Sequence, residues 1–170
     1  MRNPDPRELL SLARDAARFS YSPYSRFPVG AALLCADGSV VAGANVENRS
    51  FGLTNCAERS ALFAAVSQGK RDFAAIAVSC PASGEPVPPC GACRQALTEF
   101  CPPEMPVHYA GKDGRHVSTT LGELLPRDSL HSLKTQNPQS TAAVNPPGTS
   151  AQNPPGTSAQ NPPGTSARSR

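Results

Sequence analysis

The chain has 170 residues, of which 38% are hydrophobic, and a formal net charge of +3, which suits one folded domain of ordinary size with its own core. Its basic residues are scattered, so the charge gives no argument for nucleic acid or another polyanion as a partner. The sequence shows no apolar run near the roughly 18 residues that span a membrane and no secretory leader, so we expect a cytoplasmic protein that does not bind membranes.

Apolar residues recur at helical spacing over 6–19, which predicts an amphipathic helix packed on a sheet. The segment 20–28 combines Ser, Pro and three aromatic residues, a composition typical of a loop that presents side chains. A buried strand over 29–36, the turn signal Asp37-Gly38 and a returning strand over 40–45 then predict a hairpin.

The middle of the chain predicts two helices that begin at cysteines. Asn55 or Thr54 is expected to cap a helix that runs from about Cys56 to a stop at Gly69. A short apolar run over 73–80 predicts a central strand, and a Pro-rich loop leads from it into a second helix over 91–100, which ends before two prolines. Both cysteine-bearing segments therefore lie where a loop becomes a helix.

Two further strands over 107–110 and 116–119 are joined by a Gly-rich turn, which predicts an antiparallel pair, and a helical turn is expected over 121–125. The order of elements predicts an α/β fold, namely a three-layer αβα sandwich with a five-stranded mixed sheet. Such a sheet can bring the starts of the two cysteine-bearing helices together at one edge.

The folded domain is expected to cover 1–130, and 131–170 is expected to be a disordered low-complexity tail. An eight-residue unit, Asn-Pro-Pro-Gly-Thr-Ser-Ala-Gln, repeats from Asn145 onward. A fixed period can also indicate a solenoid, but this unit has no apolar face with which to stack.

Three thiols stand at the two helix starts, at Cys56, Cys90 and Cys93. Three thiolates would bind Zn²⁺ and leave the fourth tetrahedral position for water, as in catalytic zinc sites. Taken alone, the Cys-x-x-Cys pair could be a redox dithiol or half of a structural zinc ribbon. The other three cysteines could in principle close a four-thiolate site, but they are better read as buried or incidental thiols: Cys35, Cys80 and Cys101.

Two residue types beside the thiols complete the expected chemistry. Glu58 lies two residues after Cys56, so it can reach a zinc-bound water and shuttle protons; an isolated Glu in a first helical turn would instead be a surface carboxylate. Three thiolates give the metal a net negative surrounding, which a neighbouring cation would relieve. Arg59 and Arg94 are the candidates, with Arg59 favoured, although each could be a solvated helix-face residue.

These motifs resemble the small homotetrameric cytidine deaminases of nucleoside salvage, over about 9–125. The likeness rests on Tyr-Ser-Arg-Phe-Pro-Val-Gly at 24–30, Gly-Ala-Asn-Val-Glu-Asn at 43–48, Cys-Ala-Glu-Arg at 56–59 and Pro-Cys-Gly-Ala-Cys-Arg-Gln at 89–95. The resemblance implies zinc-dependent hydrolysis of cytidine and 2′-deoxycytidine to uridine and 2′-deoxyuridine, with ammonia as the second product. It also implies that Glu58 carries protons to the ring nitrogen and the leaving amine.

The resemblance further implies which residues hold the substrate. Asn45 and Glu47 should bind the ribose hydroxyls, Phe27 should stack on the pyrimidine, and the backbone of Ala57 should meet the base carbonyl. A carboxylate at Glu47 accepts hydrogen bonds from hydroxyls but repels a phosphate, which favours a free nucleoside over a polynucleotide.

The sequence also departs from the family pattern. An aromatic residue that crosses into a neighbouring subunit's pocket is expected shortly after Leu-Leu-Pro, but here Pro126 is followed by a segment that offers Leu130. Phe51 stands where the family often has a tyrosine, and it either lines a neighbour's site or packs at an interface. Two rival functions remain: a deaminase of another aminopyrimidine nucleoside, and a structural zinc module that binds nucleic acid.

Overall fold

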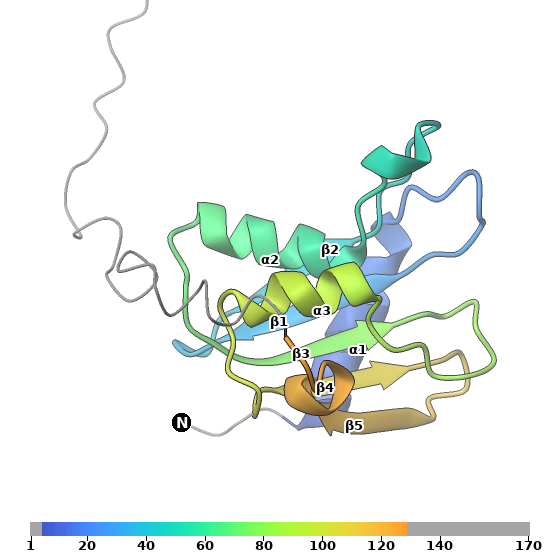
Figure 1. Ribbon diagram of the computed structural model, residues 1–170. Helices are drawn as coiled ribbons and strands as arrows, with labels where there is room; N and C mark the ends of the chain where they lie inside the picture. Colours follow the sequence, from blue (N-terminus) through green and yellow to red (C-terminus); the bar gives the residue numbers. More distant parts are fainter. Residues whose placement is uncertain (1–4, 129–170) are drawn as a thin grey trace, which may run out of the picture.

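The computed structural model describes residues 5–128 (Figure 1). The predicted tail over 131–170, together with Leu130, lies outside the described residues. The helices are α1 (Pro6–Ala16), η1 (Ala17–Phe19), η2 (Phe51–Leu53), α2 (Ala57–Ser67), α3 (Gly91–Thr98) and α4 (Leu121–Leu124), and the strands are β1 (Gly30–Cys35), β2 (Val40–Ala44), β3 (Phe73–Ser79), β4 (Pro106–Ala110) and β5 (His116–Thr120). Within this part of the chain, no helix is both long enough and apolar enough to span a membrane.

The five strands form one mixed sheet in the order β2-β1-β3-β4-β5. β1 pairs antiparallel with both β2 and β3, β3 pairs parallel with β4, and β4 pairs antiparallel with β5. The predicted mixed sheet is therefore confirmed, with β3 at its centre and the last two strands as an antiparallel hairpin.

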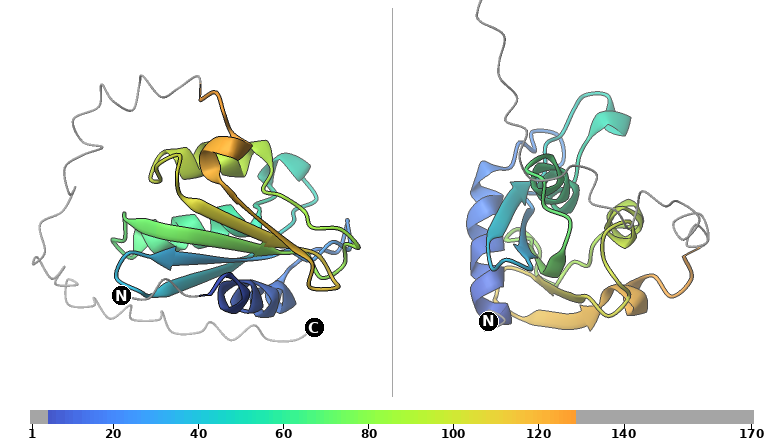
Figure 2. Two further views of the ribbon diagram at one scale, coloured as in Figure 1. Left: turned by 90° about the horizontal axis from the view of Figure 1, so that it is seen from below. Right: turned by 90° about the vertical axis from the view of Figure 1, so that its left-hand side faces the viewer.

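Helices cover both faces of the sheet (Figures 1 and 2). On one face α1 buries Leu9, Leu10 and Ala13 against small residues of β1, β3 and β4. On the other face α2 and α3 bury Leu62 and Leu97 in a larger cluster that reaches β1, β3 and β4. The three-layer sandwich is thus confirmed, and α2 and α3 lie on the same face.

The helix ends differ from the predictions. Neither Asn55 nor Thr54 caps α2, because its N-cap is Cys56, without a side-chain hydrogen bond. Asn55 instead donates from Nδ2 to Ser60 Oγ at 3.1 Å, and Thr54 Oγ1 accepts from the backbone of Asn48. Their polar groups are therefore used by the loop before the helix, which leaves the helix start open beside a sulfur.

One glycine sets how closely α2 approaches the sheet. A Cβ added to Gly43 of β2 would lie 2.4 Å from Ala61 N and 2.6 Å from Ala57 O. Both atoms belong to the backbone of α2, so no side chain could move aside to make room. Gly43 therefore lets the first turns of α2 rest on β2, next to the loop that follows this strand.

Candidate active site and metal centre

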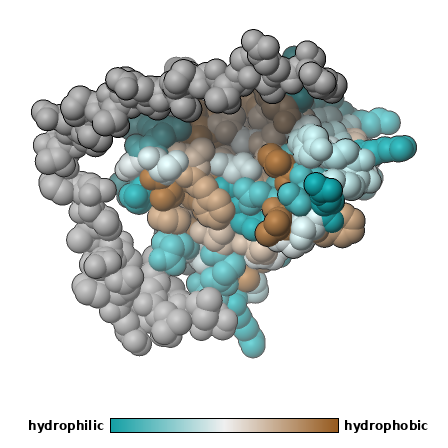
Figure 3. Space-filling view, turned by 90° about the horizontal axis from the view of Figure 1, so that it is seen from above, coloured by the Kyte–Doolittle hydropathy of each residue, from teal (hydrophilic) through white to brown (hydrophobic). Residues whose placement is uncertain are grey.

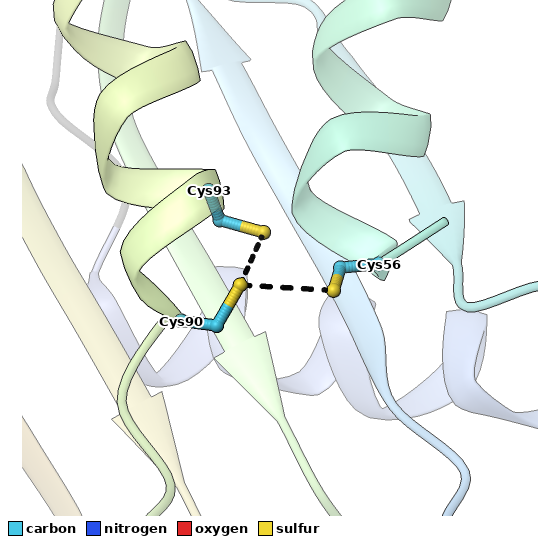
Figure 4. A group of neighbouring side chains, drawn as sticks. All are labelled: Cys56, Cys90 and Cys93. Atoms are coloured by element: carbon cyan, nitrogen blue, oxygen red, sulfur yellow. Dashed lines mark hydrogen bonds between the residues drawn. The ribbon is translucent and has the colours of Figure 1, made fainter. Parts of the chain in front are cut away.

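The three predicted ligand cysteines lie together. Cys56 Sγ is 3.8 Å from Cys90 Sγ, Cys90 Sγ is 3.4 Å from Cys93 Sγ, and all three sulfurs lie within 4.8 Å of one another. They point toward one another between the starts of α2 and α3 (Figure 4). The sequence prediction that two distant motifs form one thiol cluster is confirmed.

Two helix starts face this cluster. Cys56 is the N-cap of α2 and Cys90 is the N-cap of α3, and neither helix has a side-chain hydrogen bond at its cap. The first N–H groups of a helix have no acceptor within the helix, and together with the helix dipole they favour negative charge. Both helix starts therefore favour the thiolate form of the cysteines.

The cluster has the dimensions of a zinc site. Three thiolates held tetrahedrally at about 2.3 Å from one zinc ion lie about 3.8 Å apart. The sulfur separations of 3.8 Å and 3.4 Å are close to this value. Among residues 5–128, no fourth Cys, His, Asp or Glu joins the group. The residues thus fit a metal bound by three thiolates with one coordination position left for another ligand.

The thiols share their charge unequally. Hydrogen bonding from Cys93, together with Arg59 and Cys90, lowers the pKa of Cys56 to about 5. The pKa of Cys93 is raised, chiefly because it donates to the Cys56 sulfur and because it is buried. The cluster alone therefore favours one thiolate, at Cys56, and a divalent cation is what would let all three cysteines lose their protons together.

Glu58 is the buried carboxylate of this site. It is only 4% exposed and belongs to the first turn of α2. Burial raises its pKa above the usual range for a glutamate, and the nearby Cys56 charge adds to the effect. A carboxyl group whose neutral and charged forms are balanced closer to neutral pH is suited to accept and return protons. The alternative of a surface carboxylate is excluded by this burial.

The two candidate arginines make different contacts. Arg59 Nη2 donates to Cys56 Sγ at 3.7 Å and to Thr54 O at 3.4 Å. Arg94 instead donates to the backbone carbonyls of Pro89, at 2.7 Å, and Leu124, at 2.8 Å. Arg59 therefore lies beside a ligand sulfur, whereas Arg94 fastens α3 to the preceding loop and to α4.

The loop after β2 is tied to the start of α2. Val46 exchanges two backbone hydrogen bonds with Asn55, at 2.9 and 3.0 Å. On its other side the same segment pairs with Tyr21, which donates to Asn45 O at 3.0 Å and accepts from Glu47 N at 2.7 Å. The predicted ribose-binding pair is thus held between the 20–28 loop and the residue that precedes Cys56.

Asn45 is buried, and most of its side-chain amide is already used. Its Oδ1 accepts from Ser20 Oγ at 2.6 Å and from Val29 N at 2.9 Å, and its Nδ2 donates to Phe27 O at 3.0 Å. An amide nitrogen has two hydrogens. One Nδ2 hydrogen therefore remains for a ligand, in an orientation that the other three hydrogen bonds fix.

Glu47 accepts hydrogen bonds from the 20–28 loop. Its Oε2 accepts from the backbone N–H groups of Tyr24, at 2.9 Å, and Ser25, at 3.2 Å, and its Oε1 accepts from Ser25 Oγ. These donors, with Ser25 Oγ first, lower the pKa of Glu47 below its usual range. Glu47 is therefore a charged acceptor at neutral pH.

Phe27 and Ala57 occupy positions that suit their predicted roles. Phe27 is 37% exposed, and its backbone is fixed by Ser25 Oγ, which accepts from Phe27 N at 3.1 Å, and by Asn45. Ala57 is fully buried and is the first residue of α2, where backbone N–H groups have no partner within the helix. The ring of Phe27 and the N–H at Ala57 both remain available to a ligand.

Features outside the cluster do not contribute to it. Cys35, Cys80 and Cys101 are buried and stand apart from the three clustered thiols. An apolar pocket of about 410 Å³ lies between α3 and α4, and none of its lining residues is a predicted site residue. The interpretation of these three cysteines as buried thiols is confirmed.

Sequence reasoning missed the donors that hold Glu47. Ser25 lies 22 positions away from Glu47, and no local spacing links a loop serine to a carboxylate on another segment. The available signal was weak: a loop rich in hydroxyl groups preceded the strand pair, but nothing in it specified the partner.

Comparison with known proteins gives one family. Residues 4–109 match the family model described as “Cytidine and deoxycytidylate deaminase zinc-binding region”. The cytidine deaminase of Halalkalibacterium halodurans is 54% identical over 122 residues, which covers 72% of this chain and 92% of that protein. Blasticidin-S deaminase of Bacillus cereus is a more distant relative, 32% identical over 126 residues, which covers 70% of this chain and 88% of that protein.

A solved structure shows the same fold. The 1.6 Å crystal structure of cytidine deaminase from Burkholderia pseudomallei is 48% identical in sequence and superimposes with a TM-score of 0.68. The superposition covers 70% of this chain and 94% of that structure. The superposition therefore shows that the described chain has the fold of that cytidine deaminase.

Proposed function

The chain belongs to the cytidine and deoxycytidylate deaminase family, and we infer that it is a zinc-dependent cytidine deaminase. It hydrolyses cytidine and 2′-deoxycytidine to uridine and 2′-deoxyuridine and releases ammonia. The observation that carries this conclusion is the cluster of Cys56, Cys90 and Cys93 with a buried glutamate, Glu58, two residues after its first member.

Cys56, Cys90 and Cys93 would hold the zinc ion. When bound, zinc supplies a Lewis acid that activates water at neutral pH. Glu58 is the proton carrier: its buried carboxylate takes a proton from the attacking water and delivers it to the ring nitrogen of the base. It then takes the second proton of the same water oxygen and donates it to the departing amine, which leaves as ammonia. Burial keeps bulk water away from Glu58, so the protons that it carries pass to the substrate and not to solvent.

Arg59 offsets part of the negative charge of the thiolates. Three thiolates around a divalent cation carry a net charge of −1, which weakens the cation as a Lewis acid. The Arg59 guanidinium lies 3.7 Å from the Cys56 sulfur, where it draws electron density from that ligand. We assign Arg59 a positioning and charge-balancing role, which Arg94 does not share.

Asn45 and Glu47 together suit a hydroxyl group of the ribose. Asn45 has one free donor, the second Nδ2 hydrogen, and Glu47 is an acceptor whose pKa is lowered. A hydroxyl both accepts and donates, so one such group satisfies the two side chains at once. A phosphate offers no hydrogen for Glu47 to accept and repels its charge, which favours a free nucleoside.

Phe27 and Ala57 complete the proposed contacts to the base. The partly exposed ring of Phe27 provides a flat surface on which a pyrimidine stacks. The free N–H groups at the start of α2 lie next to Cys56, where they can donate to the carbonyl oxygen of the base. Phe27 lies next to the sugar-binding pair, since its carbonyl accepts from Asn45, whereas Ala57 lies on the segment that Asn55 joins to Val46.

The rival functions are less well supported. A structural zinc module would need a fourth protein ligand, and the cluster within residues 5–128 has three. Deamination of an aminopyrimidine antibiotic is the activity named for the blasticidin-S deaminase relative, whose identity to this chain is lower than that of the cytidine deaminase. Cytidine is therefore the favoured substrate.

We also propose that the chain assembles as a homotetramer. Exposed apolar residues gather on η2 and α2: Phe51 is 75% exposed, Leu53 71% and Phe63 51%. Hydrophobic side chains lie among hydrophilic ones on the face seen from above (Figure 3). Phe51 makes an edge contact with Tyr24 of its own chain, with ring centroids 6.0 Å apart, yet most of its surface is left for a partner. Light scattering on a sizing column tests this, and a monomer would contradict it.

We place catalysis in residues 1–130, in the cytoplasm, with a role in pyrimidine salvage. No disulfide joins the six cysteines, all of which lie within the described residues, which accords with a reducing compartment. Because 131–170 has no apolar pattern, a chain that ends at Thr135 should retain full activity. A large loss of turnover on this truncation would show that the tail is part of the working enzyme.

The decisive experiment is turnover measured by ultraviolet absorbance on the purified full chain, with zinc content measured on the same sample. Cytidine and 2′-deoxycytidine are expected to react with release of ammonia, and cytidine 5′-monophosphate is expected to react poorly. Turnover of blasticidin S without turnover of cytidine would transfer the assignment to the rival deaminase. A zinc-loaded protein that released no ammonia from any of these substrates would refute the enzymatic function.

A further inference from the structure

We propose that Ser25 is the positioning residue of the nucleoside site: it fixes the carboxylate of Glu47 and the backbone of Phe27 with one hydroxyl group. This inference rests on the proposed function, because it assumes that Glu47 binds the ribose. It adds a specificity-determining residue that lies outside the zinc cluster and outside the residues predicted to touch the substrate.

Three hydrogen bonds from the 20–28 loop orient the Glu47 carboxylate. A carboxylate offers about four acceptor sites. Glu47 uses three of them on one stretch of loop: two on Oε2 for the N–H groups of Tyr24 and Ser25, and one on Oε1 for Ser25 Oγ. The remaining acceptor site is on Oε1, the oxygen that Ser25 Oγ holds. Ser25 therefore determines where the free lone pair of Glu47 points.

The Ser25 hydroxyl has a defined direction, because it has one acceptor and one donor as neighbours. Its oxygen accepts from Phe27 N at 3.1 Å. The Glu47 carboxylate is charged and has no proton to give, so the hydroxyl hydrogen of Ser25 must point to Oε1. One hydroxyl thus serves as acceptor for the residue that stacks on the base and as donor for the residue that binds the sugar.

The backbone around Ser25 forms a closed turn. The next residue, Arg26, has a φ of 55°, a left-handed conformation that a side chain larger than glycine adopts at some cost. Arg26 N donates to Ser22 O at 3.0 Å, which closes the turn. The turn directs the Ser25 hydroxyl and both neighbouring N–H groups toward Glu47, so the strained residue lies next to the group that needs precise placement.

Ser25 should therefore affect substrate binding and not the chemical step. Ser25 contacts Glu47 and Phe27, and neither its hydroxyl nor its backbone hydrogen-bonds to the thiol cluster or to Glu58. Loss of the hydroxyl should therefore weaken the binding of the ribose and leave the proton transfers unchanged. The two backbone donors to Glu47 remain in a Ser25→Ala variant, so the loop keeps most of its support.

The experiment compares Ser25→Ala, Ser25→Thr and Ser22→Ala on two substrates, cytidine and 2′,3′-dideoxycytidine. Ser22 is a matched control, because it lies in the same loop and its hydroxyl hydrogen-bonds with that of Ser20, at 3.0 Å, and not with Glu47. For cytidine, Ser25→Ala is expected to raise KM about tenfold, the loss of one hydrogen bond to a charged group, with little change in kcat. Ser25→Thr keeps the hydroxyl and should stay within about threefold of the wild type.

The dideoxy substrate separates positioning from loop damage. It lacks the 2′- and 3′-hydroxyls, one of which we take as the partner of Glu47, so Ser25→Ala and wild type should turn it over with equal kcat/KM. An equal penalty on both substrates, or a fall in kcat on cytidine, would overturn the proposal and leave a structural role for Ser25. Failure of the wild-type protein to deaminate cytidine would instead refute the proposed function, and zinc content with thermal melting confirms that each variant is folded.

Discussion

The backbones of Val46 and Asn55 exchange two hydrogen bonds, 2.9 Å from Val46 N to Asn55 O and 3.0 Å in the opposite direction. Glu47 follows one member of this pair and Cys56 follows the other. The backbones of the proposed sugar-binding residue and of the proposed first zinc ligand are therefore fixed relative to each other by this pairing. In the proposed function, the same two hydrogen bonds keep the sugar site and the metal site at a constant separation.

Removal of one ligand should remove the metal. In Cys90→Ala two thiolates remain, which is too few to retain zinc against a chelator. We expect less than about a tenth of the wild-type zinc content and no measurable turnover, because loss of a group that only hydrogen-bonds to a metal ligand already weakens metal binding about 10- to 100-fold. Zinc determination on dialysed protein tests this.

The control is Cys35→Ala, which removes a buried thiol that stands in β1 outside the cluster. It should lower the free energy of unfolding by about 1 kcal/mol and keep one zinc ion per chain. Full zinc occupancy in Cys90→Ala would contradict the ligand assignment.

Arg59 should matter for metal retention more than for folding. Arg59→Ala removes the cation 3.7 Å from the Cys56 sulfur, and we expect zinc to be lost to a chelator about 10-fold faster. Arg59→Lys retains a positive charge and should lie between the two. Equal rates of zinc loss in all three proteins, followed with a colorimetric chelator, would show that Arg59 is a packing residue.

Acid should weaken a contact between the turn after β1 and the loop after α2. Lys70 Nζ lies 2.8 Å from Asp37 Oδ2, and its hydrogen bond is the largest cause that lowers the pKa of Asp37 in the folded protein. A carboxyl group with a lower pKa when folded stabilises the fold above its unfolded pKa of about 3.9. That contribution is lost as the pH falls below this value.

Thermal melting of wild type and Asp37→Asn between pH 7 and pH 3 checks the sign. The variant should melt at a lower temperature at pH 7, and the difference should shrink as the pH approaches 3. Zinc release at acid pH affects both proteins, so the difference between them is the informative quantity. A difference that grows at low pH would contradict the prediction.

Gly43→Ala should disturb both stability and activity. The added Cβ would lie 2.4 Å from Ala61 N, so α2 must move away from β2. We expect a loss of about 1–3 kcal/mol in the free energy of unfolding and a larger fractional loss of turnover, because α2 carries Cys56 and Glu58. Gly84→Ala is the control, since an added Cβ there meets nothing within 4 Å. Equal effects of the two substitutions would contradict the close approach.

The fold and the cluster of three thiols could be predicted because each contributing motif has a local signal. Apolar periodicity gave the type of each element, and the spacing of Cys90 and Cys93 over one helical turn gave a chelating pair. Predictions failed where the answer depended on which partner a polar side chain contacts in the folded chain. The cap of α2 was assigned to Asn55 or Thr54 from their residue types, but both are used by loop contacts in three dimensions.

The choice between Arg59 and Arg94 shows the same limit. Both follow a ligand motif by one residue, and sequence alone could not decide which of them reaches a sulfur. The structure decides it because Arg94 meets the carbonyl of Leu124, which belongs to an element 30 positions away. Ser25 and Glu47 were likewise separated by a whole hairpin, so their pairing left no trace in local spacing.

Glu58 provides the most direct test of the central claim, that a three-thiolate zinc site acts together with one buried proton carrier. Glu58→Gln keeps the shape of the side chain and removes its ability to take up a proton. Turnover of cytidine is measured at matched zinc content and with the fold verified by melting. We predict one zinc ion per chain, an unchanged fold and a rate lower by roughly 10²- to 10⁴-fold. A rate near that of the wild type would contradict the account.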